Sequence, residues 1–212
     1  LIKDDKSLEY ILAVTGAHLK NDMGYTKDEI INDGFNIDYE IPMFNENTDS
    51  GGAMVRSFAR VTDKVTYCLE DSKPDLILSG FDIGANMAVT IAGAHMNIPV
   101  AHIQGGEVTG TIDESIRHAM SKFSHYHFES NQDEVDRLIK MGEEPKNIFV
   151  IGALGVENIK KLNFYKKKEI EKKLNTILFK KNFLITIHPE TLGKSKLIKN
   201  LDIFFNFLKS IK

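Results

Sequence analysis

The sequence lacks several features that would place it in a specialised class of protein. It has one cysteine, Cys68, which excludes an internal disulfide, and a lone thiol in a helical pattern favours a reducing compartment. No apolar run reaches the roughly 18 residues of a membrane span, and Leu1 does not open a signal-peptide pattern. The sequence therefore predicts a cytoplasmic protein with no membrane partner.

An excess of charge of one sign is also missing. The formal net charge is -3, and lysines are interspersed with acids through most of the chain. The exception is a lysine-rich stretch at residues 160–181, whose composition is typical of a solvated helix and connector. Since there is no basic field to attract a phosphate backbone, we expect no nucleic-acid partner.

Common cofactor and metal signatures are absent as well. Neither G-x-G-x-x-G nor G-K-[ST] occurs, so a dinucleotide fingerprint and an NTPase phosphate loop are unsupported. No serine lies in G-x-S-x-G, which argues against an α/β hydrolase. The histidines at 102, 118, 125 and 127 show no HExxH or Cys/His spacing, and we expect no metal.

What the sequence does contain is a regular alternation of short apolar runs and helical patterns. The apolar runs lack polar alternation, as strands do when both faces of a parallel sheet are covered. This order predicts a Rossmann-like α/β layer. The expected strands are 10–16, 75–80, 98–103, 125–130 and 147–153, and the expected helices are 52–71, 86–96, 112–123 and 133–141.

The texture changes after Gly155. A lysine-rich helical stretch is followed by "NFLITIHPET" (182–191), which predicts one more buried strand before a final helix. We therefore expect two domains. Residues 1–155 would form a Rossmann-like domain, and residues 156–212 a connector and the first strand–helix unit of a second α/β domain.

Polar side chains follow the predicted strands at positions where parallel sheets bind ligands. Asp82, Gln104 with Glu107, and His188 come directly after three of these strands. Ligands of open parallel sheets lie beyond the carboxyl ends of the strands, where helix N-termini point their N–H groups. These residues are the first candidates for a functional site.

A dense polar segment follows the strand at 98–103. Gly105 and Gly106 permit close approach of the backbone or a positive φ. Thr111 and Glu114 fit a capping box, in which each side chain would bind the backbone N–H of the other residue. Asp113 is not used by that cap. Carboxylates beside an arginine and a histidine suit general acid–base work on a polar or phosphorylated ligand.

Three pieces of the chain carry a resemblance to a known family. They are "DLILSGFDIGANMAVTIAGAHMNIPVAH", "HIQGGEVTGTIDESIRHAMSKFSHYHF" and "ITIHPET". Together they resemble the hydrolysing UDP-N-acetylglucosamine 2-epimerases of sialic- and legionaminic-acid pathways. The similarity covers most of residues 10–153, with a shorter match around His188, and "GGEVTGTIDESIRHA" is its most specific part.

The resemblance implies a GT-B-like fold with a sugar nucleotide between two Rossmann-like halves, and a homodimer. The implied reaction eliminates UDP to leave a 2-acetamidoglucal, then adds water to give free N-acetylmannosamine. It needs neither NAD nor a metal. The resemblance implies catalytic roles for Asp82, Asp113, Glu107, Gln104 and His188, and substrate binding by Gly105, Gly106, Arg117 and Thr111.

The chain departs from the family pattern at two strand ends. Many members have glutamate where this chain has Gln104, and glutamine cannot act as a general base. Several have His-Gly-Asp where this chain has Gly80-Phe81-Asp82. Either Asp113 or Glu107 takes the role of the base, or the substrate differs, for example a diacetamido sugar carried on UDP or GDP.

Two other functions remain open on the sequence alone. A glycosyltransferase would use the same fold to pass the sugar to an acceptor. A catalytically silent sugar-nucleotide-binding protein would explain Gln104. The family's first strand and most of its nucleotide-binding second domain have no counterpart in the sequence. By the resemblance, residues 156–212 would therefore open a truncated C-terminal nucleotide-binding domain, and we expect the chain to be part of a longer enzyme.

Overall fold

The computed structural model describes residues 2–45, 50–81, 84–187 and 194–210. The chain divides into two structural units, Leu1–Ile151 and Gly152–Lys212, each with its own elements. Over the described residues, none of the helices combines the length and the apolar character that a membrane crossing requires.

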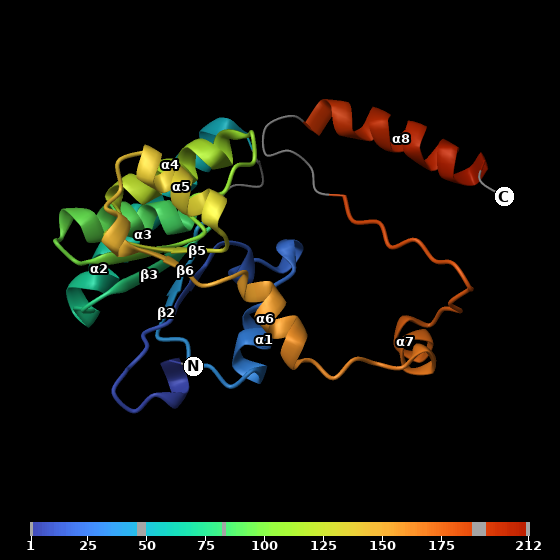
Figure 1. Ribbon diagram of the computed structural model, residues 1–212, viewed down its shortest axis with the longest axis horizontal. Helices are drawn as coiled ribbons and strands as arrows, with labels where there is room; N and C mark the ends of the chain where they lie inside the picture. Colours follow the sequence, from blue (N-terminus) through green and yellow to red (C-terminus); the bar gives the residue numbers. More distant parts are fainter. Residues whose placement is uncertain (1, 46–49, 82–83, 188–193, 211–212) are drawn as a thin grey trace. The chain divides into compact units, whose positions relative to one another are not determined.

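The first unit is built around a four-stranded parallel sheet (Figure 1). Its strands follow chain order as β3 (Ile77–Gly80), β4 (Val100–Ile103), β5 (Tyr126–Glu129) and β6 (Ile148–Val150). The register pairs Ala101 with Tyr126 and His127 with Ile148, so the carboxyl ends of neighbouring strands meet at one edge. All four predicted strands of this region are confirmed, and each is a little shorter than expected.

A helix lies between each pair of consecutive strands, as the alternating pattern predicts. These helices are α3 (Gly84–His95), α4 (Ile112–Phe123) and α5 (Gln132–Lys140). The sequence sets the start of α5 locally, because the Asn131 side chain accepts a hydrogen bond from the Glu134 N–H at 3.1 Å. Such starts place the N-termini of α4 and α5 beside the carboxyl ends of the strands.

The largest hydrophobic core lies between the sheet and helix α2 (Gly51–Ser72), which packs on α3. Val61, Val65 and Leu69 recur every four residues along α2 and are all buried. The facing residues of α3 are small, with Ala88 fully buried, so the two helices can approach closely. This packing anchors the β3 side of the sheet.

Two short parallel strands form a separate sheet in the first unit. They are β1 (Ala13–Thr15) and β2 (Tyr39–Ile41), with Ala13 paired with Tyr39. Three short helical segments connect them, η2 (Gly16–Leu19), η3 (Asn21–Met23) and α1 (Lys27–Asn32). The strand predicted at 10–16 is confirmed in its second half. Strand β2 was not predicted, because three residues followed by a proline give no periodic signal.

The second unit contains α6 (Leu154–Lys161), α7 (Lys167–Leu174) and α8 (Lys194–Ser210). The strand predicted within 182–191 is wrong for its described part, because residues 182–187 form no ladder and Leu184 is 96% exposed. A strand needs a neighbour to take its backbone hydrogen bonds. The described part of this unit contains helices and irregular segments and no strand, so the apolar run has no partner strand there. The assignment of this second unit to a nucleotide-binding domain stays a prediction.

Adjacent residues of α5 test this description of the core. Leu138 is fully buried, whereas its neighbour Ile139 is 40% exposed. We expect Leu138→Ala to lower the free energy of unfolding by about 2–5 kcal/mol, because it deletes buried methyl groups and leaves a cavity. Ile139→Ala is the control and should cost less than about 1 kcal/mol. Urea unfolding of both variants measures the difference, and equal losses would contradict the packing described.

Candidate functional site

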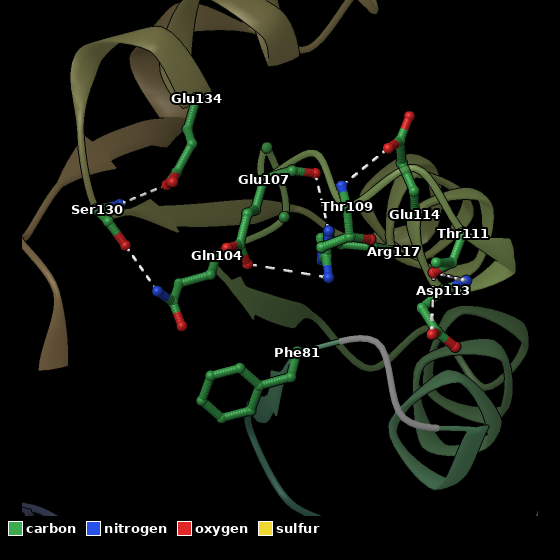
Figure 2. Close-up of polar contacts among 12 residues, drawn as sticks. Phe81, Gln104, Glu107, Thr109, Thr111, Asp113, Glu114, Arg117, Ser130 and Glu134 are labelled. Atoms are coloured by element: carbon green, nitrogen blue, oxygen red, sulfur yellow. Dashed lines mark hydrogen bonds and ion pairs between the residues drawn. The ribbon is translucent and has the colours of Figure 1, made fainter. Parts of the chain in front are cut away.

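The predicted site residues that the structure describes lie on one continuous segment after β4 (Figure 2). Gln104, Gly105, Gly106 and Glu107 form the loop that leaves the strand. Thr111 is the N-cap of α4, Asp113 lies in its first turn and Arg117 in its second. Asp82 and His188, the other two candidates, lie outside the described residues.

The ends of β3 and β4 both carry a residue in the left-handed backbone conformation. The φ angle is 66° at Phe81 and 59° at Gln104. Neither is glycine, and such a conformation costs on the order of 1–2 kcal/mol for a residue with a Cβ. Strain of this kind is concentrated at functional sites, where the surrounding contacts impose it. Phe81, which is 47% exposed, was not among the predicted site residues.

Contacts with the next strand fix Gln104. Its backbone N–H donates to the Phe128 carbonyl at 2.9 Å, continuing the β4–β5 ladder by one residue. Its side-chain Nε2 donates to Ser130 Oγ at 2.8 Å, as Figure 2 shows. The amide side chain is therefore held at the sheet edge by β5 and the loop that follows it.

Glu107 and Arg117 form a second contact across the segment. Arg117 Nη1 donates to the Glu107 carbonyl at 2.9 Å, and Nη2 lies 3.9 Å from the Glu107 carboxylate. The Arg117 side chain is 3% exposed and that of Glu107 is 47% exposed. The buried guanidinium thus positions a carboxylate that is open to solvent. A direct contact of Arg117 with substrate stays a prediction.

The start of α4 differs from the predicted capping box. Thr111 Oγ1 accepts from the Asp113 N–H at 3.3 Å, whereas the box requires the N–H of Glu114. The Glu114 carboxylate binds the N–H groups of Thr109 and Gly110, at 2.9 and 2.6 Å, and these two bonds hold the pKa of Glu114 below its ordinary value. The predicted capping box is wrong because the loop turns at Gly110, where φ is 70°, and the N–H groups of Thr109 and Gly110 point toward Glu114.

Asp113 is therefore part of the cap after all. Thr111 Oγ1 also donates to Asp113 Oδ2 at 3.0 Å, so the hydroxyl binds both the backbone and the carboxylate of Asp113. This arrangement fixes the direction of the half-buried carboxylate. The expectation that the cap leaves Asp113 unused is wrong, and Thr111 becomes a residue that orients it.

A buried acid lies beneath the two glycines. Glu129, the last residue of β5, has no exposed surface and accepts from the N–H groups of Gly105 and Gly106 at 3.2 and 2.9 Å. Burial is the main reason that the pKa of Glu129 is raised to about 7, and the nearby Glu134 carboxylate raises it further. Glu129 was not among the predicted site residues. A glutamate closing an apolar strand was the available signal.

His102 is a structural residue of the same edge. Its Nε2 lies 3.2 Å from the Phe81 carbonyl and its Nδ1 3.1 Å from Ser121 Oγ. Burial lowers the pKa of His102 to about 4, so the ring is neutral at pH 7 and Nε2 carries its proton. Within the described ranges, no group of three or more His, Cys, Asp or Glu side chains is arranged to hold a metal ion.

Known proteins are similar to this chain along its whole length. The family model described as UDP-N-acetylglucosamine 2-epimerase matches residues 1–212. The GDP/UDP-N,N'-diacetylbacillosamine 2-epimerase (hydrolyzing) of Campylobacter jejuni is 38% identical over the whole chain, which covers 55% of that relative. The UDP-N,N'-diacetylbacillosamine 2-epimerase (hydrolyzing) of Legionella pneumophila is 35% identical over 89% of the chain and 50% of the relative. The chain thus spans about half the length of these proteins.

A solved structure shows the fold. The chain is similar to the UDP-GlcNAc 2-epimerase of Neisseria meningitidis bound to UDP-GlcNAc, with a TM-score of 0.67 at 21% identity. The match covers 82% of this chain and 47% of that one. It confirms the predicted GT-B-like α/β fold class.

The revised cap gives a prediction for Thr111. Thr111→Ala removes the hydroxyl that binds Asp113, and we expect a loss of about 1 kcal/mol in the free energy of unfolding. Thr111→Ser keeps the hydroxyl and serves as the control, with little loss expected. Chemical denaturation compares the two variants. Equal stability of the alanine variant and the wild type would show that this cap is not formed in solution.

Proposed function

Because the chain belongs to the UDP-N-acetylglucosamine 2-epimerase family, we propose that it forms part of a hydrolysing sugar-nucleotide 2-epimerase. The proposed substrate is UDP-N-acetylglucosamine or a diacetamido sugar carried on UDP or GDP. The products are the free 2-epimer and the nucleoside diphosphate. The proposal rests on two acids at the loop after β4 and the start of α4. Glu107 and Asp113 are each held in place by a neighbouring side chain. The chain that carries them matches the family over residues 1–212.

The proposed reaction has two steps. In the first, a base removes the C2 proton while the bond between C1 and the diphosphate oxygen breaks, which leaves a C1–C2 double bond and the free nucleotide. In the second, water supplies a hydroxyl group to C1 and a proton returns to C2 from the opposite face. There is no net redox change, so we propose no nicotinamide or metal cofactor. The steps require one proton acceptor, one donor and stabilisation of the departing diphosphate.

Glu107 and Asp113 are the proposed acid–base pair among the described residues. Glu107 presents a solvent-accessible carboxylate beside the Arg117 guanidinium. Asp113 is half-buried and oriented by Thr111. Either carboxylate can accept the C2 proton, and the other then serves as the donor. Gln104 cannot exchange protons in this way, so its proposed role is to hydrogen-bond the sugar or the catalytic loop.

The remaining predicted members of the site are proposed on the resemblance. Asp82 would act as an acid or base at the end of β3, and His188 would donate to the substrate phosphates. Gly105 and Gly106 would allow close approach of the substrate, although their described contacts are with the protein. We also propose a cytoplasmic homodimer, in keeping with the single free thiol of Cys68.

The diacetamido sugars are the preferred candidates for the substrate. The relatives from Campylobacter jejuni and Legionella pneumophila are both named for diacetylbacillosamine. Gln104 adds an amide donor and acceptor to the site edge, which suits recognition of an additional acetamido group better than a second negative charge would.

The proposed function is tested by incubating the full-length protein in deuterated water with UDP-N-acetylglucosamine and with UDP- and GDP-linked diacetamido sugars. We expect free sugar carrying deuterium at C2, together with one equivalent of nucleoside diphosphate. Transfer to an added acceptor without free sugar would identify a glycosyltransferase. Tight nucleotide binding without sugar release would identify a silent binding protein.

Asp113 gives the sharpest test among the described residues. We expect Asp113→Asn to lower kcat by roughly 10²–10⁴-fold, because an amide cannot exchange the proton, with a small change in melting temperature. Asp133→Asn is the matched control, since Asp133 is an exposed acid in the first turn of α5. It should leave kcat unchanged. A kcat near the wild-type value for Asp113→Asn would remove Asp113 from the chemistry.

A further inference from the structure

Glu129 makes a contact that the proposed chemistry does not use. Its two carboxylate oxygens accept separate hydrogen bonds, one from the Gly105 N–H at 3.2 Å and one from the Gly106 N–H at 2.9 Å. The side chain is completely buried. One acid therefore holds two consecutive peptide groups of the loop between Gln104 and Glu107.

The surrounding structure leaves this pair of peptides little freedom. A Cβ on Gly106 would lie 2.5 Å from the Glu134 carbonyl oxygen, and one on Gly105 would lie 2.6 Å from His102 Nδ1. Arg137 donates from α5 to the Gly106 carbonyl. The loop is thus pressed against α5 and β4, and Glu129 supplies acceptors for the N–H groups that remain.

We propose that Glu129 is a positioning residue of the site, which holds the Gly105–Gly106 backbone so that Gln104 and Glu107 face the substrate. The attachment itself rests on the geometry, and its catalytic consequence rests on the proposed function. Glu129 acts through the backbone of the loop. Being fully buried, it does not touch the sugar nucleotide.

The charged and titratable groups around the Glu129 carboxyl come from several elements. Glu134 is close enough to raise its pKa, and Arg137 binds the same peptide from α5. His102 borders Gly105 from β4, and its low pKa makes it neutral. The loop itself contributes Glu107, whose carbonyl accepts a hydrogen bond from Arg117 of α4. On the β6 side, Glu129 pairs with the apolar Val150.

This environment makes the attachment of the Gly105–Gly106 backbone to Glu129 depend on pH. The pKa of Glu129 is raised from 4.5 to about 7, so its proton stabilises the fold below pH 4.5, and that contribution is lost as the pH rises through 7. The ionised carboxylate is the stronger acceptor for the two N–H groups. The raised pKa nevertheless means that burial outweighs this gain, so the same linkage makes the loop easier to open as the pH rises through 7, and we expect it to be held less firmly above pH 7 than below it.

The test uses Glu129→Gln in the full-length enzyme. An amide offers one acceptor oxygen, so one of the two glycine N–H groups would face an NH₂ group instead. We expect kcat to fall by about 10- to 100-fold, as for other groups that orient a catalytic side chain, with a smaller change in KM. The step near pH 7 in the wild-type profile of kcat/KM should disappear.

Glu143→Gln is the matched control. Glu143 is a nearly buried acid of the same unit that pairs with Lys122 and His127 and contacts neither glycine. It should keep the wild-type kcat and the step near pH 7. If Glu129→Gln has the same kcat and pH profile as this control, Glu129 is merely structural and the proposal is overturned.

Amide hydrogen exchange separates this proposal from the proposed function. In the wild-type protein, the Gly105 and Gly106 amides should be protected, less strongly above pH 7 than below it once the ordinary pH dependence of amide exchange is corrected for. Glu129→Gln should lose this protection for at least one of them, and Glu143→Gln should keep it. Unprotected glycine amides in the wild type would overturn the proposal, whether or not free sugar is released. Protected amides in a wild type that releases no sugar would overturn the function and leave the attachment standing.

Discussion

The parallel register of β4 and β5 is the constraint on which the rest of the site depends. Pairing of Ile103 with Phe128 brings the residues that follow each strand side by side. Gln104 can then bind Ser130, while Glu129 reaches the N–H groups of Gly105 and Gly106. A shift of one residue in this register would turn each of these side chains to the other face of the sheet. The loop from Gln104 to Glu107 is therefore an extension of the sheet, fixed by the same ladder.

Acidic groups gather at this edge, and each of those described is stabilised by a hydrogen-bond donor or by a nearby positive charge. Glu114 and Glu134 accept backbone N–H bonds, and Glu107 lies near Arg117. Asp113 is held by a hydroxyl group at a helix N-terminus, where the helix dipole favours negative charge. Among the described acids of this edge, Glu129 combines full burial with a pKa raised to about 7. Carboxylates can thus be crowded at one edge because most of them are hydrogen-bonded to the backbone of the same two loops.

The sequence predicted the elements of the sheet well, because its strands and helices differ in period and length. It failed where structure depends on partners far along the chain. β2 is too short to show a pattern, and the apolar run at 182–187 has no strand beside it among the described residues. The segment from Gln104 to Arg117 was predicted to be part of a functional site from its residue types and from the family resemblance. Glu129 was missed, since only the folded register shows that its carboxyl lies under Gly105 and Gly106.

The same contacts give a physical reason for Gln104. Its backbone is in the left-handed conformation, and its Nε2 donates to Ser130 at the point where the peptides of Gly105 and Gly106 bind Glu129. A glutamate here would lose that donor and add another carboxylate to a loop that Glu129 already holds. Like charges in one site raise each other's pKa, so the added carboxylate would be harder to ionise. A neutral amide at position 104 keeps the bond to Ser130 and adds no further charge to this edge, which gives a physical reason for the departure from the family pattern.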